Sequence, residues 1–289
     1  KDLKILAYET TFYQNAGASA DLSPAVMART LFHGTNSYFI PNVKMTAYSC
    51  KTNLPPNTAF RGFGGPQGMF VIESALSHAA KELSISTHKL QKINLLKDGN
   101  EFPYGQIADG VELNSIWGKM ESKFDIETIE KEINDFNANH SDMKKGFSLM
   151  PVTFGISFTK TPMNQARALV HIYTDGSVGV STGAVEMGQG VNTKMLQIAT
   201  QIFSITPKRV KLESTNTTRV ANTSPSAASS TADLNGKALE KACNALMDRL
   251  KICSADHFNV SSHDVSVKDG VDYTNENQTD LTWDQLVMM

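Results

Sequence analysis

The residues best suited to chemistry in this chain form a glycine-rich loop at positions 60–67, with the sequence FRGFGGPQ. Three glycines within four positions, from Gly62 to Gly65, allow the backbone to turn sharply and to approach a ligand closely. Pro66 suits the first turn of a helix, where its missing N–H is not needed, and apolar residues recur beyond it at spacings of three and four. The run therefore predicts a loop that opens onto a helix N-terminus, where anions and ligand oxygens bind.

Two further loops have the same construction, in which small residues precede an amphipathic stretch. They are EMGQG at 186–190 and SPSAASST at 224–231. Three such loops could converge on one large ligand that carries a phosphate. Each loop taken alone could also be an ordinary helix start, because neither the G-x-G-x-x-G dinucleotide motif nor the P-loop motif occurs in the context that it requires.

Periodicity and turn residues predict the elements that must position these loops. Helices are predicted at 23–32, after Pro66, at 86–97, over a charged stretch at 114–139, and after Gly190, Thr231 and Thr282. Strands are predicted at 3–16, 38–52, 145–159, 168–182, 210–213 and 265–267, with a hairpin turn at 174–177. A polar segment at 137–145 predicts a boundary, so we expect domains at 1–140 and 141–289. The mixture predicts an α+β fold with mixed sheets and flanking helices.

Composition and charge limit the kinds of partner that we expect this protein to bind. A formal net charge of -2 gives no electrostatic reason to expect nucleic acid. No apolar run approaches the roughly 20 residues of a membrane span, so we expect no membrane contact. The chain opens without a signal peptide. We expect its cysteines to be reduced core residues of a cytoplasmic protein. The three cysteines are too few and too scattered for a disulfide framework, and the seven histidines show no metal-ligand spacing. We therefore expect no metal held directly by protein side chains.

Four segments together resemble one known family. They are 54–67, 146–165, 185–193 and 224–233, and their order and approximate spacing are those of the molybdenum-binding portion of the xanthine dehydrogenase/aldehyde oxidase family. The resemblance covers nearly the whole chain, and the joint match is far more specific than any single loop. It implies a two-part molybdopterin-binding region, with residues 1–140 as the first part and 141–289 as the second.

The resemblance also implies a pocket for a purine substrate. Arg29 stands just before Leu-Phe-His and matches the family's arginine that hydrogen-bonds the purine and offsets its charge; a guanidinium stays charged and presents donors in a fixed plane. Phe63 matches the aromatic residue that stacks on the substrate ring, and Phe158 matches the one that meets the ring edge-on; such contacts contribute roughly 0.5–1.5 kcal/mol each beyond burial. The other implied substrate contacts are Thr159, Ala227 and Ala228.

The cofactor implied by the resemblance is molybdopterin, often as its cytosine dinucleotide in bacteria, with molybdenum held by the dithiolene of the cofactor. The residues implied to contact it are Phe60, Arg61, Gly62, Met187, Gly188, Gln189, Ser229 and Thr231. The resemblance further implies 2Fe-2S clusters and FAD on other domains or subunits, and a homo-oligomer of the complete enzyme.

The implied reaction is hydroxylation of hypoxanthine or xanthine toward urate, with hydride transfer to molybdenum and Arg29 as the catalytic residue in this chain. The general-base glutamate of the family lies in a Gly-Glu-Pro-Pro-like motif, which this sequence lacks. We therefore expect an internal fragment that is inactive alone.

Two alternatives stay open. One is an aldehyde oxidase or other molybdenum hydroxylase, although aldehyde-oxidising relatives usually lack the arginine. The other is a non-catalytic binding module of the same fold, which intact Arg29, Phe63, Phe158 and Gln189 argue against.

Overall fold

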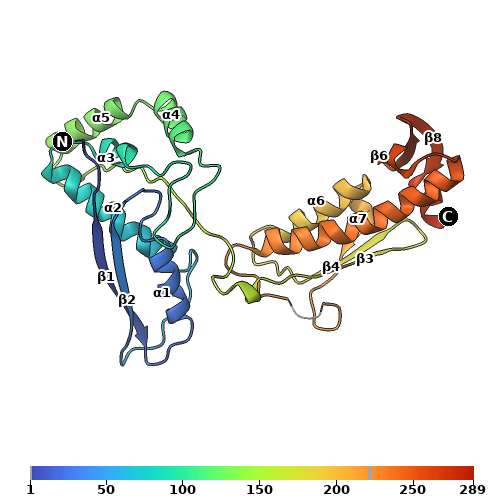
Figure 1. Cartoon of the computed structure of the whole chain (residues 1–289), viewed down its shortest axis with the longest axis horizontal. Helices are drawn as coiled ribbons and strands as arrows, with labels where there is room; N and C mark the ends of the chain where they lie inside the picture. The colour runs from blue at the N-terminus through green and yellow to red at the C-terminus, as the bar shows by residue number, and fades with distance from the viewer. Residues whose placement is uncertain (1, 221–222) are drawn as a thin grey trace. The chain divides into compact units, whose positions relative to one another are not determined.

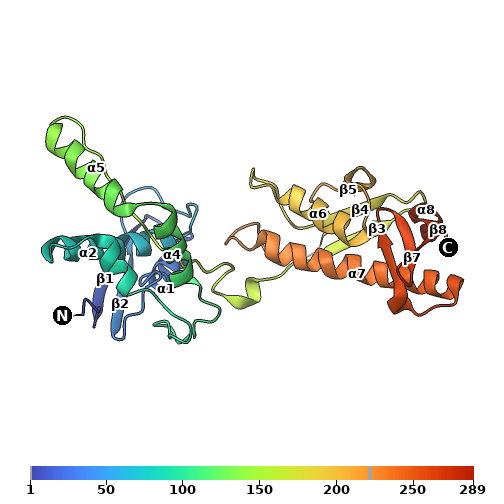
Figure 2. The same ribbon diagram turned by 90° about the horizontal axis from the view of Figure 1, so that it is seen from above.

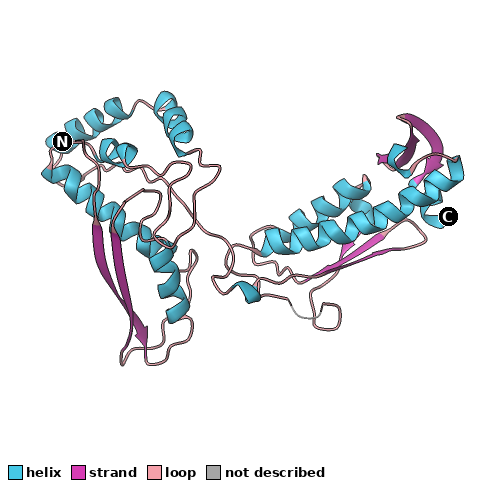
Figure 3. Cartoon of the chain, in the orientation of Figure 1, coloured by secondary structure: helices cyan, strands magenta, loops and turns pink. Residues whose placement is uncertain are grey.

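The computed structural model describes residues 2–220 and 223–289, and it divides into two compact units. The first unit ends at Gly155, and the second runs from Ile156 to Met289 (Figure 1). This division lies beyond the predicted boundary at 140/141, because side chains of the first unit hold residues 149–155 by hydrogen bonds. The mixed helices and strands confirm the predicted α+β fold (Figure 3).

The first unit is built on two parallel strands joined by a helix. β1 (Tyr8–Gly17) pairs in parallel with β2 (Val43–Lys51), and α1 (Ser23–Phe32) forms the crossover between them. The predicted helix over 23–32 is confirmed, with Pro24 in its first turn. The glycine loop leads into α2 (Gly65–Glu82), which packs against α1. The loop at 60–67 is thus attached to the helix that carries Arg29.

Shorter helices complete the first unit: α3 (Thr87–Ile93), α4 (Leu113–Lys123) and α5 (Ile126–Asn139). The predicted helical stretch over 114–139 is confirmed, but it is divided into two helices. The chain leaves the helix at Phe124, and the side chain of Asp125 accepts the N–H of Thr128 at 3.1 Å to cap a new one. The core of the unit contains Tyr38, Ile72, Leu76, Leu90, Leu95 and Trp117.

The predicted strand at 145–159 was wrong, since none of these residues lies in a sheet. Residues 149–155 bind side chains instead. The amide of Gln91 donates to the carbonyl of Leu149 at 2.7 Å, and the amide of Asn36 donates to the carbonyl of Pro151 at 2.7 Å. β-type residues therefore extend here without a strand partner, because polar side chains satisfy the backbone.

The second unit places two helices on a small mixed sheet. β3 (Ala168–Ile172) and β4 (Val178–Thr182) form the predicted hairpin, and β5 (Val210–Leu212) pairs with β4 in parallel. α6 (Val191–Phe203) and α7 (Thr231–Phe258) lie side by side (Figures 1 and 2). Their apolar faces bury Val178, Val180, Met195, Ala199, Phe203, Leu239 and Cys243 in one core.

A second sheet and a last helix follow α7. The antiparallel strands are β6 (Val265–Lys268), β7 (Val271–Thr274) and β8 (Asn277–Thr282), of which the sequence predicted only the first. α8 (Trp283–Met288) begins after Thr282 as predicted, and Thr282 with Gln285 forms a capping box. Among the described helices, none is long and apolar enough to cross a membrane.

Candidate functional site

Arg29 lies near the end of α1 with only 4% of its surface exposed. Its Nη1 donates a hydrogen bond to the carbonyl of Gly155, and its guanidinium carbon lies 5.6 Å from the centre of the Phe154 ring. Burial lowers the pKa of Arg29, but a guanidinium stays protonated at physiological pH. The structure thus holds a permanent positive charge in a largely enclosed place, where charge interactions are stronger than in water.

His33, which the sequence analysis did not assign, completes this cluster. Its Nε2 accepts the N–H of Gly155 at 3.0 Å. Its Nδ1 lies 2.9 Å from the carbonyl oxygen of Arg29 and must carry the proton to donate to it. Burial lowers the pKa of His33, the hydrogen bond to the Arg29 carbonyl opposes this shift, and the charge of Arg29 makes a smaller contribution that lowers the pKa. His33 is therefore a neutral imidazole that joins α1 to residue 155. The Leu-Phe-His motif was the signal that could have found it.

The glycine loop needs its glycines to pack on α1. Gly64 has a φ of 98°, and a Cβ there would overlap the carbonyl oxygen of Val26. A Cβ at Gly68 would be 2.5 Å from the carbonyl oxygen of Thr30. The hydroxyl of Thr30 lies 3.1 Å from the carbonyl oxygen of Gly64 and donates to it. Backbone thus touches backbone, which fixes the loop against the helix of Arg29.

Phe63 is held in an unusual backbone conformation in this loop. Its φ is 52°, a left-handed value that is strained for a bulky residue, and its N–H donates to the carbonyl of Phe60 at 2.8 Å. The side chain is half-buried, whereas Phe60 is 83% exposed and Arg61 is also exposed. Strain of this kind often occurs at ligand sites. The contacts of Gly64 with α1 thus place the loop at 60–65 against the helix that carries Arg29.

A cluster of polar side chains around Glu73 connects α2 to the segment that ends at Gly155. The carboxylate of Glu73 on α2 accepts hydrogen bonds from the Asn36 amide at 2.8 Å, the Tyr38 hydroxyl at 2.7 Å and the Gln91 amide at 2.8 Å. Burial and the neighbouring charge of Glu73 raise the pKa of Tyr38. Asn36 and Gln91 also bind the carbonyls in 149–151, so the cluster connects α2 to the segment that ends at Gly155.

In the second unit, backbone and hydroxyl hydrogen bonds join three loops. The N–H of Ser157 donates to the carbonyl of Ala228 at 2.8 Å. The N–H of Val185 donates to the hydroxyl of Ser226 at 2.8 Å, and the N–H of Ser224 donates to the carbonyl of Gln165 at 2.9 Å. The loop at 224–231 therefore binds both the segment of Phe158 and the loop of Gln189.

The backbone of Phe158 is clamped by Asn164, a residue that the sequence analysis did not assign. The N–H of Phe158 donates to the Oδ1 of Asn164 at 2.8 Å, and the Nδ2 of Asn164 donates to the carbonyl of Phe158 at 2.9 Å. The ring of Phe158 is half-buried, and Thr159 is exposed. The carbonyl of Ala228 accepts the N–H of Ser157, so the segment of Phe158 contacts the loop at 224–231.

Glu186 organises the EMGQG loop. Its Oε1 accepts the N–H groups of Gly188 and Gly190 at 2.9 Å each, and its Oε2 accepts that of Asn192 at 3.0 Å. These bonds lower the pKa of Glu186, with Asn192 and then Gly190 as the largest causes. Both glycines have positive φ, 90° and 77°, and apart from their chain neighbours no described residue lies within 4 Å of where a Cβ would stand. Met187, before Gly188, and Gln189, between the two glycines, are exposed.

The third loop enters α7 without a side-chain cap. Ser230 is the N-cap residue, and its hydroxyl donates to the carbonyl of Ala227 at 3.1 Å instead of accepting from the helix. Ala228 and Ser229 both have positive φ, 54° and 55°. Ser229 is exposed and Thr231 is half-buried. In the next turn, the buried Oδ1 of Asn235 has no hydrogen-bond partner in the described part of the chain.

These features fit a large polar cofactor. Open space beside Gly188 and Gly190 lets a ligand approach the backbone, and the α7 N-terminus and the Oδ1 of Asn235 retain hydrogen-bonding capacity. Across residues 2–220 and 223–289, no group of three or more His, Cys, Asp or Glu side chains could hold a metal ion.

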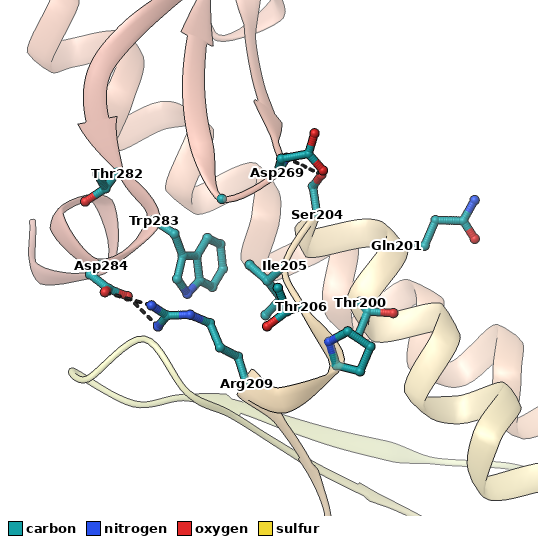
Figure 4. A pocket seen from close by; sticks show the side chains of 12 residues that line it. Thr200, Gln201, Ser204, Ile205, Thr206, Arg209, Asp269, Thr282, Trp283 and Asp284 are labelled. Atoms are coloured by element: carbon teal, nitrogen blue, oxygen red, sulfur yellow. Dashed lines mark hydrogen bonds and ion pairs between the residues drawn. The ribbon is translucent and has the colours of Figure 1, made fainter.

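A separate pocket of about 660 Å³ lies at the far end of α6 (Figure 4). Arg209 and Asp284 form a bidentate ion pair on its wall, at 2.5 and 2.8 Å, beside the Trp283 ring. None of the cofactor- or substrate-binding residues predicted from the sequence is among the described residues that line this pocket.

Two family models with the same description match most of this chain. A family model described as a molybdopterin cofactor-binding domain matches residues 1–95, and another with the same description matches residues 119–289.

Similar sequences occur in much longer proteins. Xanthine dehydrogenase/oxidase from Gallus gallus is 45% identical over 251 residues, which is 87% of this chain and 18% of that protein. Nicotinate hydroxylase from Emericella nidulans is 42% identical over 250 residues, 86% of this chain and 18% of that protein. This chain therefore spans about a fifth of the length of these relatives.

A solved structure agrees with the fold. Quinoline 2-oxidoreductase from Pseudomonas putida superposes with a TM-score of 0.82 over 99% of this chain and 38% of that chain, at 19% identity.

Proposed function

Because this chain belongs to the family of molybdopterin cofactor-binding domains, in the xanthine dehydrogenase group of molybdenum hydroxylases, we propose that it provides part of the cofactor and substrate pocket of a purine hydroxylase. The substrate class is hypoxanthine and xanthine, which would be oxidised toward urate. When bound, the molybdenum cofactor supplies the oxidising chemistry, including acceptance of a hydride from the substrate carbon. The residues of this chain bind and orient the two ligands.

The buried charge of Arg29 is the observation that carries this proposal. A guanidinium in an enclosed site would stabilise negative charge as it develops on the oxygens and nitrogens of an oxidised purine. A simple aldehyde has no ring nitrogens on which such charge could develop. The identity of 45% to a xanthine dehydrogenase/oxidase supports the same substrate class.

The remaining roles are those that the family resemblance implies, and the local geometry supports them. Phe63, fixed by its strained backbone, would stack on the substrate ring, and Phe158, fixed by Asn164, would contact the ring edge. Thr159 would bind a substrate oxygen, and Ala227 and Ala228 would leave space beside the ring.

For the cofactor, the exposed loop at 60–62 would offer backbone N–H groups. Met187, Gly188 and Gln189 would contact the pterin, and Ser229 with Thr231 would bind the pterin or its phosphate at the uncapped start of α7. We also propose iron–sulfur and FAD domains or subunits as electron carriers, a homo-oligomeric complete enzyme and a cytoplasmic location. The sequence has no Gly-Glu-Pro-Pro-like motif, so the general base would come from elsewhere in the longer protein and this chain alone would be inactive.

A second candidate function is hydroxylation of another nitrogen heterocycle. It is favoured by the identity of 42% to a nicotinate hydroxylase, which is close to the identity with the xanthine dehydrogenase/oxidase. A carboxylate-bearing heterocycle would also be bound by the charge of Arg29.

The test compares the complete, cofactor-loaded enzyme with its Arg29→Met variant on xanthine, nicotinate and benzaldehyde. Arg249→Met, an exposed arginine on α7, is the matched control. We expect kcat/KM for xanthine to fall on the order of 100-fold in Arg29→Met, as when one charge-stabilising donor is removed, and to stay unchanged in the control. Xanthine turnover that survives the Arg29 change would overturn the assignment of Arg29. Turnover of nicotinate or benzaldehyde without xanthine would replace the purine proposal.

A further inference from the structure

The carboxylate of Glu186 joins three backbone N–H groups that point inward at alternate positions, 188, 190 and 192. Two of these belong to glycines in left-handed conformations, which an ordinary residue would adopt only with strain. The third belongs to the first turn of α6, whose N–H groups have no partner within the helix. One side chain therefore closes the loop and caps the helix that follows it.

Gln189 closes the same loop from the other direction. Its Oε1 accepts the N–H of Met187 at 2.5 Å, and its Nε2 donates to the carbonyl of Val185 at 2.8 Å. An amide nitrogen has two hydrogens, so the second hydrogen of Nε2 can still be donated to a ligand. The two side chains together fix the backbone of residues 187–190 without help from a ligand.

Glu186 also changes which ligand groups the loop can accept. A helix N-terminus ordinarily attracts anions, but here a carboxylate of the chain already stands at the start of α6. A phosphate brought to that place would meet a like charge. The start of α7 has no side-chain cap, so an anionic group is directed there.

We propose that Glu186 is a positioning residue, which pre-forms the loop at 187–190 for a neutral, hydrogen-bonding edge of the cofactor and keeps anionic groups away from the α6 N-terminus. This inference rests on the proposed function only for the identity of the cofactor. The loop geometry that Glu186 imposes is a property of the chain itself.

The test uses the complete enzyme with Glu186→Gln, which keeps the size of the side chain and removes its charge. A carboxamide also turns an N–H₂ group toward the N–H of Asn192 or of the glycines. Glu276→Gln, an exposed glutamate in the β7–β8 turn, is the matched control. Hydrogen exchange by mass spectrometry follows residues 187–192 in cofactor-free enzyme, with and without inorganic phosphate. Molybdopterin content is measured separately by the fluorescence of the released, oxidised pterin.

We expect exchange at 187–192 to become on the order of tenfold faster in Glu186→Gln, because charge-assisted hydrogen bonds are lost. Exchange in the second half of α7 should stay unchanged, which shows that the unit is folded. We also expect phosphate to slow exchange at 190–193 in this variant but not in the wild type, and molybdopterin content to fall several-fold. The control should match the wild type in each measurement.

Two results would overturn the proposal. One is exchange in Glu186→Gln equal to that of the wild type. The other is faster exchange with full molybdopterin content, which would make Glu186 a cap with no effect on the cofactor. Failure of the proposed function is recognised separately. In that case wild-type enzyme would hold molybdopterin but leave xanthine unoxidised, and the loop measurements would still be read in the same way.

Discussion

The imidazole Nε2 of His33 accepts the backbone N–H of Gly155 at 3.0 Å, although 122 residues separate them in the sequence. The other ring nitrogen of His33 binds the carbonyl of Arg29 on the same helix. One neutral side chain therefore holds the end of the first unit against the helix that carries the buried charge. This relationship depends on the protonation state of His33.

Acid should loosen this contact. Burial lowers the pKa of His33, so the unfolded form binds a proton more readily than the folded form. The stabilisation is complete above the ordinary histidine pKa of about 6.5 and is lost as the pH falls through the lower pKa of the folded state. Hydrogen exchange of residues 152–156, corrected for the intrinsic pH dependence, should show increasing exposure below pH 6.5. His33→Gln, which can keep one donor and one acceptor, should flatten this dependence. An unchanged dependence in that variant would contradict the assignment.

Gly64→Ala should destabilise the first unit by about 3 kcal/mol or more. Its cost combines a strained positive φ, about 1–2 kcal/mol, with overlap against the Val26 carbonyl. Gly99→Ala is the control, since Gly99 also has a positive φ, 79°, but apart from its chain neighbours no residue in the described part of the chain lies within 4 Å of its Cβ position. Urea denaturation followed by Trp117 fluorescence, in a Trp283→Phe background, compares the two. Equal losses would show that the contact with α1 contributes nothing.

Glu73→Gln should destabilise the first unit by about 1–3 kcal/mol, the usual effect of leaving buried polar groups without partners. Three donors converge on this carboxylate, and a carboxamide would turn its own N–H₂ group toward at least one of them. The same Trp117 assay applies, with the exposed Glu82→Gln on α2 as the control. The variant should also speed hydrogen exchange in 149–153. A loss no larger than that of Glu82→Gln would argue against the cluster.

Asp272→Asn should stabilise the second unit by about 1 kcal/mol at pH 7, because it replaces a carboxyl group whose charged form is penalised by burial with a neutral carboxamide. Asp272 is 1% exposed; its Oδ2 accepts the Ser254 hydroxyl at 2.5 Å, and its Oδ1 has no partner in the described chain. Burial raises the pKa of Asp272, so the wild type loses stability as the pH rises through that pKa. Urea denaturation read by Trp283, in a Trp117→Phe background, should show a smaller pH dependence in the variant. A less stable variant would mean that the carboxylate is needed in its charged form.

The sequence by itself determined the helices and hairpins whose signals are local. Pro24 and Pro66 marked helix starts, the glycines at 62–65 marked the loop, and TDGS marked the hairpin of β3 and β4. Thr282 marked α8 through its cap. Such elements depend on the conformations that a few neighbouring residues can adopt, so a short window contains the information. The order and approximate spacing of four segments, 54–67, 146–165, 185–193 and 224–233, also indicated the family.

Only the tertiary structure decided how the polar side chains are paired. The extended residues at 145–159 have strand-like composition, but Asn36 and Gln91 supply the partners that a neighbouring strand would have supplied. Arg29 lies on α1 and is buried because Phe154 and Gly155 return to that helix. His33 acquires its role from the backbone N–H of Gly155, 122 residues away. Long-range pairing of this kind depends on where the chain comes back to itself, and no local pattern of residues encodes that.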